Sequence, residues 1–189
     1  MKGLPPGIYG AKLTVIDNVS KREETLDFGT IVAGPWDRKL RIGAEILAYR
    51  IDYVGDSVDP QTARLVDNGY LVLPNPLGVY NLTDSMLWVY AEVYGLHYDS
   101  TAPGKFRLEF AVLDQAGQTV RDFGYALKST PGTSAVIAQN LSLEGLGRGG
   151  FWLRMVVIDP VVGSSDTAQL ALWHIESEAD VTPPRTAFD

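Results

Sequence analysis

The chain opens with Leu-Pro-Pro-Gly-Ile-Tyr at residues 4–9, and a matching stretch, Leu-Gly-Arg-Gly-Gly-Phe, occupies residues 146–151 near its end. Position 4 corresponds to position 146 and Asp17 to Asp159, so the offset is a constant 142 residues. The same offset, without a gap, aligns Gly7 with Gly149, Val15 with Val157, Ile16 with Ile158, Val19 with Val161 and Thr25 with Thr167. Because an internal repeat constrains the architecture of a chain, these two copies are the starting point for predicting the fold.

Each copy leads into residues whose apolar positions alternate, as in a strand with one face in a core. These positions are Tyr9, Ala11, Leu13 and Val15 in the first copy, and Phe151, Leu153, Met155 and Val157 in the second. A partner strand follows each copy, through Leu26, Phe28 and Val32 in the first hairpin and through Ala168, Leu170 and Leu172 in the second. The repeated unit is therefore interpreted as a β-hairpin.

Short strand patterns separated by Gly, Pro, Asn and Asp fill the rest of the chain. They predict strands at about 40–53, 63–73, 85–98, 105–114, 119–128, 134–141, 150–159 and 166–175. We predict an all-β fold with an immunoglobulin-like β-sandwich at residues 38–176. At residues 1–35 we expect the C-terminal hairpin of a second, incomplete sandwich, and at residues 177–189 a tail or linker.

A hairpin alone is at best marginally stable in water. The first hairpin is therefore expected to dock on the following domain, to pair between two chains in a homodimer, or to belong to a longer polypeptide that completes its sandwich. We favour a remnant of a longer polypeptide that docks on the following domain.

The repeated motif has a physical rationale in such sandwiches. Its glycine allows a sharp turn into the strand, and its aromatic residue fills the end of the core. Tyr9 could also make the hydroxyl bond of a tyrosine corner, whereas Phe151 keeps only the packing role. Asp17 and Asp159 follow the strands, where a carboxylate accepts local backbone N–H bonds in an Asx-type turn. Calcium binding is the alternative, but no acidic cluster surrounds either aspartate in sequence.

Composition excludes several classes of function. The formal net charge of −7 disfavours nucleic acid and anionic membranes as partners. Without cysteine, the chain has no disulfide, thiolate nucleophile or cysteine-ligated metal. No apolar run reaches the roughly 18 residues of a membrane span, and residues 1–6 lack the apolar core of a signal peptide.

One predicted strand carries a row of aromatic residues. Every second position shares a face, which here holds Trp88, Tyr90, Glu92, Tyr94, Leu96 and Tyr98. If the aliphatic residues between them face the core, this row is an exposed platform for stacking on sugar rings or for anchoring a protein. The alternative is that a neighbouring loop or the first hairpin half-buries the aromatic rings.

The chain offers little for catalysis. His97 and His174 are far apart in sequence and are interpreted as surface or interface residues. Glu92 with Asp99 or Glu109 is only a weak match to a glycosidase acid/base pair. The glycine-rich residues 145–150 precede a strand, whereas phosphate-binding loops lead into a helix. No enzyme activity, cofactor or metal is expected.

Four stretches of the sequence carry a family resemblance. They are residues 4–9 with Val15-Ile16-Asp17, Leu-Arg-Ile-Gly-Ala-Glu-Ile-Leu-Ala at 40–48, Val-Leu-Pro-Asn-Pro at 72–76 and Leu-Trp-Val-Tyr-Ala-Glu-Val-Tyr-Gly-Leu at 87–96. Together they resemble the β-sandwich region of bacterial GWxTD-domain proteins. The resemblance covers roughly residues 4–175. It implies tandem immunoglobulin-like modules in an exported, extracytoplasmic bacterial protein, periplasmic or at the cell surface. No Gly-Trp-x-Thr-Asp sequence is present, so the role of that domain does not carry over.

The expected function is a non-enzymatic structural or protein-interaction module that spaces or docks other domains. The alternative is a carbohydrate-binding module that uses Trp88, Tyr90 and Tyr94. A protein partner is expected in the first case and a glycan in the second.

Overall fold

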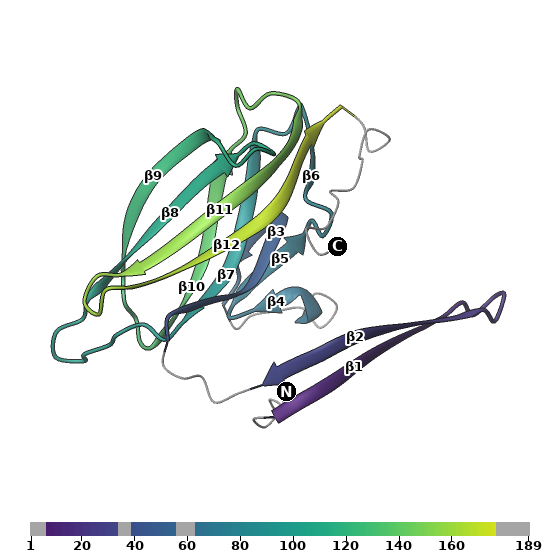
Figure 1. The fold of residues 1–189 in the computed structure, drawn as a ribbon, viewed down its shortest axis with the longest axis horizontal. Coiled ribbons are helices and arrows are strands. Elements are labelled where there is room, and N and C mark those ends of the chain that lie inside the picture. The colour runs from purple at the N-terminus through teal and green to yellow at the C-terminus, as the bar shows by residue number, and fades with distance from the viewer. Residues whose placement is uncertain (1–6, 34–38, 56–62, 177–189) are drawn as a thin grey trace. The chain divides into compact units, whose positions relative to one another are not determined.

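The alternating segments form strands throughout the computed structural model, which describes residues 7–33, 39–55 and 63–176 (Figure 1). The prediction of an all-β fold is confirmed, since a single 3-10 turn, η1 (Ala63–Leu65), accompanies the strands among the described residues. By their internal contacts, residues 1–37 and 38–189 form two compact units. No helix in the described ranges is long and apolar enough to cross a membrane.

The first unit contains one antiparallel hairpin of β1 (Gly7–Ile16) and β2 (Glu23–Ala33). Next to its loop, the pairing runs without a break from Lys12 opposite Asp27 to Ile16 opposite Glu23. An irregularity between Gly10 and Lys12 then shifts the register by one residue, as a β-bulge does.

The second unit contains two five-stranded sheets. Sheet I has the order β10-β7-β3-β5-β4, from β10 (Ser134–Ser142), β7 (Met86–Tyr94), β3 (Arg41–Tyr53), β5 (Tyr70–Pro74) and β4 (Val66–Asp67). Sheet II has the order β6-β12-β11-β8-β9, from β6 (Val79–Asn81), β12 (Ser164–Ile175), β11 (Gly149–Asp159), β8 (Lys105–Leu113) and β9 (Thr119–Ser129). Neighbouring strands are antiparallel, except that β6 runs parallel to β12.

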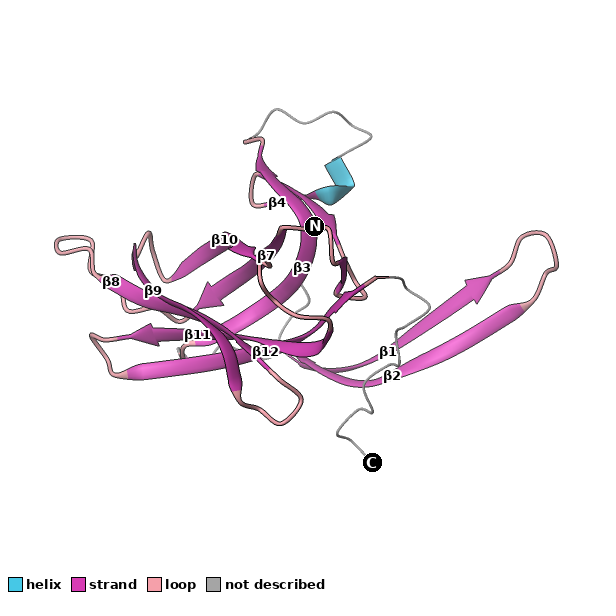
Figure 2. Ribbon diagram, turned by 90° about the horizontal axis from the view of Figure 1, so that it is seen from above, coloured by secondary structure: helices cyan, strands magenta, loops and turns pink. Residues whose placement is uncertain are grey.

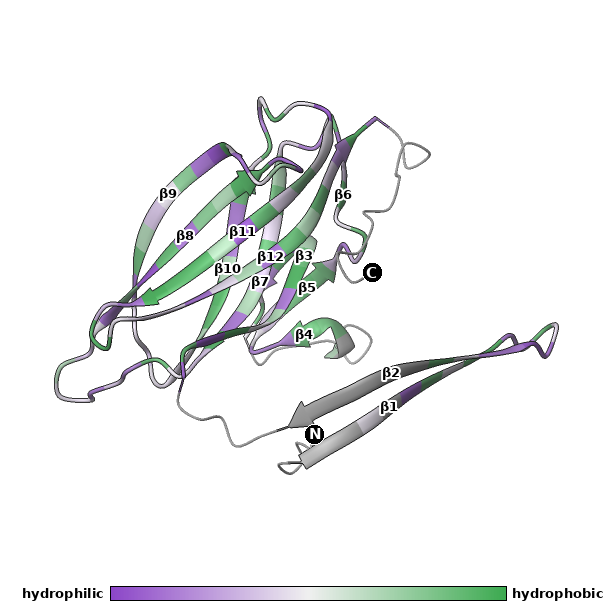
Figure 3. Ribbon diagram, viewed as in Figure 1, coloured by the Kyte–Doolittle hydropathy of each residue, from purple (hydrophilic) through white to green (hydrophobic). Residues whose placement is uncertain are grey.

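The two sheets form two layers around a shared apolar core (Figure 2). Apolar residues alternate with polar ones along many of these strands, as Figure 3 shows. Fully buried core residues include Leu87, Val89, Ala91 and Val93 of β7 and Leu153, Met155 and Val157 of β11. Each large aliphatic side chain buried in this way contributes about 1.5–3 kcal/mol, so this core stabilises the second unit.

Two expected strands differ from the observed ones. Residues 63–73 form η1, β4 and β5 instead of one strand, because Asn68 and Gly69 adopt positive φ values of 47° and 80°. That pair of conformations makes a tight hairpin turn, for which Asn-Gly is the preferred sequence. The strand expected at 85–98 ends at Tyr94. At Gly95, φ is +74° and a Cβ atom would lie 2.1 Å from the Lys39 carbonyl oxygen, so only glycine fits there.

The edge strand β9 is irregular. Its pairing with β8 shifts between Glu109 and Ala111, and again between Val112 and Leu113. At both places β9 contains one residue more than β8, so β9 is bulged twice.

Candidate functional site

The predicted aromatic row lies on the outer face of sheet I. Along β7, the aliphatic side chains enter the core between the sheets, and the intervening residues Trp88, Tyr90, Glu92 and Tyr94 point the other way. Tyr90 has no exposed surface and packs with Ala48, Ile51 and Val72 in a second, smaller cluster, against which Trp88 also packs. Trp88, Glu92 and Tyr94 are half-buried.

The turn between β4 and β5 contacts this face through one side chain. The Asn68 amide donates hydrogen bonds to the Tyr90 hydroxyl and to Glu92 Oε1, both at 2.8 Å. The Tyr90 hydroxyl donates to the same Glu92 oxygen at 3.0 Å. Burial raises the pKa of Tyr90 far above its ordinary value, and the Glu92 contact raises it further, so the hydroxyl remains a donor.

The row does not continue beyond β7. Leu96 is buried in the core between the sheets, and Tyr98 lies in the following loop with 41% of its surface exposed. The change of direction at Gly95 therefore corrects the expectation that Tyr98 shares a strand face with Trp88. Tyr90 offers no ring surface for stacking, which leaves Trp88 and Tyr94 as separate, half-buried rings.

The weakly matched catalytic groups are not brought together. Glu92 lies in sheet I, whereas Glu109 lies in sheet II and forms an ion pair with Arg107 at 2.6 Å. Asp99 accepts bonds from the Thr101 hydroxyl and N–H, which lower the pKa of its carboxyl. Within the described ranges, no three His, Asp or Glu side chains are arranged to hold a metal ion.

The two hairpins of the repeat share one strand register. In the first unit Lys12 lies opposite Asp27 and Ile16 opposite Glu23. At the offset of 142 these pairs become Arg154 with Gln169 and Ile158 with Ser165, and both pairs exist in β11–β12. The repeat in sequence is therefore also a repeat in backbone pairing, up to the bulge in β2.

The loops of the two hairpins also match. Asp17 Oδ1 accepts the Val19 N–H at 2.8 Å, and Asp159 Oδ1 accepts the Val161 N–H at 3.0 Å. The predicted Asx-type turn is thus confirmed at both aspartates. The left-handed conformation falls at the same place in each loop, at Lys21 with φ 58° and Gly163 with φ 65°.

The surroundings of the hairpins differ. Met155 and Val157 have no exposed surface, whereas the corresponding Leu13 and Val15 are 48% and 57% exposed. Leu26, opposite Leu13, is 58% exposed. The first hairpin thus has exposed apolar side chains at the positions that sheet I covers in the second hairpin.

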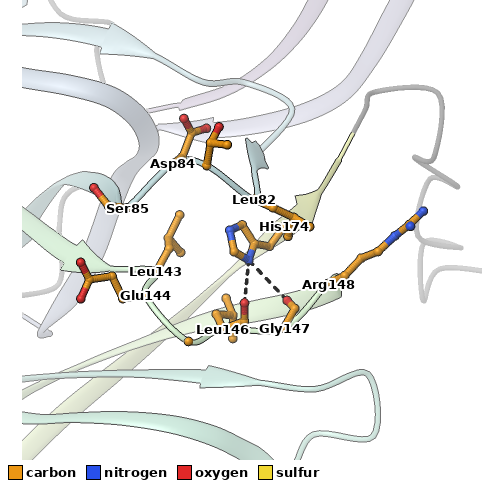
Figure 4. Close-up of a pocket in the computed structure, with 11 residues that line it drawn as sticks. Leu82, Asp84, Ser85, Leu143, Glu144, Leu146, Gly147, Arg148 and His174 are labelled. Carbon is orange, nitrogen blue, oxygen red and sulfur yellow. Dashed lines mark hydrogen bonds between the residues drawn. The ribbon is translucent and has the colours of Figure 1, made fainter.

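A pocket of about 420 Å³ lies at the end of the sandwich where β7 and β11 begin and β12 ends (Figure 4). It is lined by residues 82–85, residues 143–148 and His174. A backbone hydrogen bond joins the two loops, in which the Leu143 N–H donates to the Ser85 carbonyl at 2.8 Å. The Asp84 carboxylate accepts the Asn81 N–H at 2.8 Å and so closes the turn after β6.

His174 is only 3% exposed, which corrects its interpretation as a surface residue. It follows Leu172 by two positions in β12 and therefore faces inward, a signal that the alternating pattern contained. Its Nδ1 atom lies 3.0 Å from the Leu146 carbonyl oxygen and 3.3 Å from that of Gly147 (Figure 4). Its Nε2 atom is buried and has no hydrogen-bond partner among the described residues.

No protein-family model matches the chain, and no curated protein matches it with significant similarity.

Proposed function

We propose that this chain is a non-enzymatic structural and protein-interaction module from a tandem array of immunoglobulin-like sandwiches. The observation that carries the proposal is the shared register and loop geometry of β1–β2 and β11–β12. A hairpin with the strand pairing and apolar face of β11–β12, an inner strand pair of sheet II, belongs in a sandwich of the same kind.

The strand order supports the immunoglobulin-like part of the proposal. Sheet II contains β9-β8-β11-β12, which corresponds to C′-C-F-G of a variable-type domain. Sheet I contains β10-β7-β3, which corresponds to E-B-A. In this assignment β11–β12 is the F–G hairpin that ends the domain, and β1–β2 is the F–G hairpin of a preceding one. The strands β4, β5 and β6 are additions to this plan.

The exposed face of the first hairpin supports a protein partner. Leu13, Val15 and Leu26 are apolar and about half exposed on one face, and such a face is stabilised when a second layer covers it. The proposed cover is the remainder of the preceding sandwich, and pairing of two hairpins in a homodimer is the competing arrangement. The exported, extracytoplasmic location belongs to the same proposal and is supported by the resemblance to the sandwich region of GWxTD-domain proteins.

A hairpin transplant tests the equivalence on which the proposal depends. In the full chain, residues 149–175 are replaced by residues 7–33, which have the same length and offset. We expect a cooperatively folded chimera. Far-ultraviolet circular dichroism and the fluorescence of the two remaining tryptophans, Trp36 and Trp88, would follow its denaturation.

The control replaces residues 149–175 by residues 8–34. A shift of one residue turns every side chain to the opposite face of the strand, so this second chimera is expected not to fold. Loss of folding in the first chimera, or equal folding of both, would contradict the proposal.

A further inference from the structure

We propose that the pocket around His174 binds a small organic cation with an ammonium N–H group, and that Nε2 of His174 accepts its hydrogen bond. His174 belongs to β12, but the contacts proposed for its ligand do not depend on the tandem array. The pocket is formed by residues 82–85 and 143–148, with His174 buried among them.

The hydrogen bonds of His174 determine which ring nitrogen is free. Its Nδ1 atom faces two backbone carbonyl oxygens, those of Leu146 and Gly147, and carbonyl oxygens only accept. Nδ1 therefore carries the proton, and in the neutral ring Nε2 presents a lone pair. A buried acceptor without a partner costs free energy, and a donor in the pocket would recover it.

The internal repeat indicates that the hairpin does not need a histidine here. The offset of 142 assigns Val32 to the position of His174. The pairing beyond the bulge in β2 instead places Ala33 there, since Ala33 lies opposite Gly7 as His174 lies opposite Gly149. Both candidates are apolar residues, which is the usual choice for an inward-facing position near the end of a strand. His174 is therefore a departure within the repeat, and its side chain lines this pocket.

Two carboxylates in the pocket lining attract a cation, although the Arg121 guanidinium donates hydrogen bonds to the Ser142 and Glu144 carbonyls of the same loop. Asp84 and Glu144 line it, and Asp84 uses only Oδ2 to hold the Asn81 N–H. Arg148 also contributes to the lining, but its guanidinium points away from His174 in Figure 4 and lies 3.8 Å from Glu176. An ammonium group supplies both a donor for His174 Nε2 and a positive charge for the carboxylates.

Nitrogen NMR of the two imidazole rings tests the proposal on the full-length chain. His97 is the only other histidine, so a His97→Gln variant assigns both sets of resonances. We expect ethanolamine hydrochloride to shift the Nε2 resonance of His174 saturably and to leave that of His97 unchanged. Tetramethylammonium chloride, which has the charge without an N–H donor, and ethylene glycol, which has donors without the charge, are expected to cause no saturable shift.

Two substitutions separate the contributions of the Asp84 carboxylate and of His174 to ethanolamine binding. Asp84→Asn is expected to weaken ethanolamine binding about two- to fivefold, the range of an exposed ion pair. The matched control, Asp99→Asn, lies beyond the opposite end of β7 and should leave binding unchanged. His174→Val, which introduces the residue of the first repeat, should abolish the amide shifts that ethanolamine causes at Gly145 and Gly147. The proposal is overturned if ethanolamine acts no differently from sodium chloride, which would leave water as the occupant, or if ethylene glycol binds equally well.

Discussion

Asp17 and Asp159 are the same residue of a repeat in two different environments. Both accept a backbone N–H two residues ahead in the loop. The second oxygen of Asp159 accepts the His97 N–H at 2.7 Å, which ties the loop after β7 to the β11–β12 turn. The second oxygen of Asp17 accepts the hydroxyl of Ser20 in the same loop. Asp159 is 2% exposed, whereas Asp17 is exposed.

The difference in burial predicts that replacing each aspartate by alanine has unequal effects on stability. Asp159→Ala removes a charged acceptor from two N–H groups and is expected to lower the free energy of unfolding of residues 38–176 by about 2–4 kcal/mol. Asp17→Ala should leave that free energy unchanged, because the side chain is exposed and its bonds are local to the first hairpin. Denaturant titration followed by the fluorescence of Trp88, Trp152 and Trp173 measures both. Equal losses of unfolding free energy in the two variants would contradict the explanation from the different surroundings of the two aspartates.

The carboxyl of Asp17 also provides a pH test. The Ser20 hydroxyl bond, followed by the Val19 N–H bond, lowers the pKa of Asp17 below its ordinary value of 3.8. The lowered pKa means that the turn gains stability from the ionised form above the ordinary pKa and loses it as the pH falls through the lowered pKa. Ser20→Ala should therefore raise the pKa of Asp17 towards 3.8. Carboxyl carbon NMR measures this change, and the Asp99 carboxyl, which is held by Thr101, should not respond.

At the scale of the element, β7 illustrates what alternation predicts and what it leaves open. The alternation of Leu87, Val89, Ala91 and Val93 identifies the face that enters the core. It does not predict how far the opposite face is covered, because Asn68 reaches Tyr90 from 22 residues away. The end of β7 depends on the close approach of Lys39 to Gly95, which is also a contact between distant residues.

The paired hairpins give a prediction for matched core positions. Met155→Ala opens a cavity in the inter-sheet core and is expected to cost about 2–5 kcal/mol. Leu13→Ala, at the corresponding position of β1, removes a half-exposed side chain and should change the unfolding of residues 38–176 by less than about 0.5 kcal/mol. The same denaturation measurement compares the two variants. A large effect of Leu13→Ala on that transition would show that this side chain is covered.

For the whole molecule, the sequence predicts the fold class better than the candidate sites. The all-β class follows from alternation and turn residues, and the register shared by the hairpins follows from the constant offset. The Asn-Gly turn at residues 68–69 was a readable hairpin signal that the single expected strand at 63–73 overlooked. The inward position of His174 was also readable from Leu172. Its partners Leu146 and Gly147 were not, because that contact depends on how a loop closes over β12.

The two bulges in β9 affect whether another chain can pair with this edge strand. An unbroken outer strand would offer a regular row of backbone groups, onto which another chain could add and continue the sheet indefinitely. The two extra residues in β9 interrupt that row, and Arg121, Asp122 and Lys128 place charges along it. Sideways growth into fibrils is therefore disfavoured on this side.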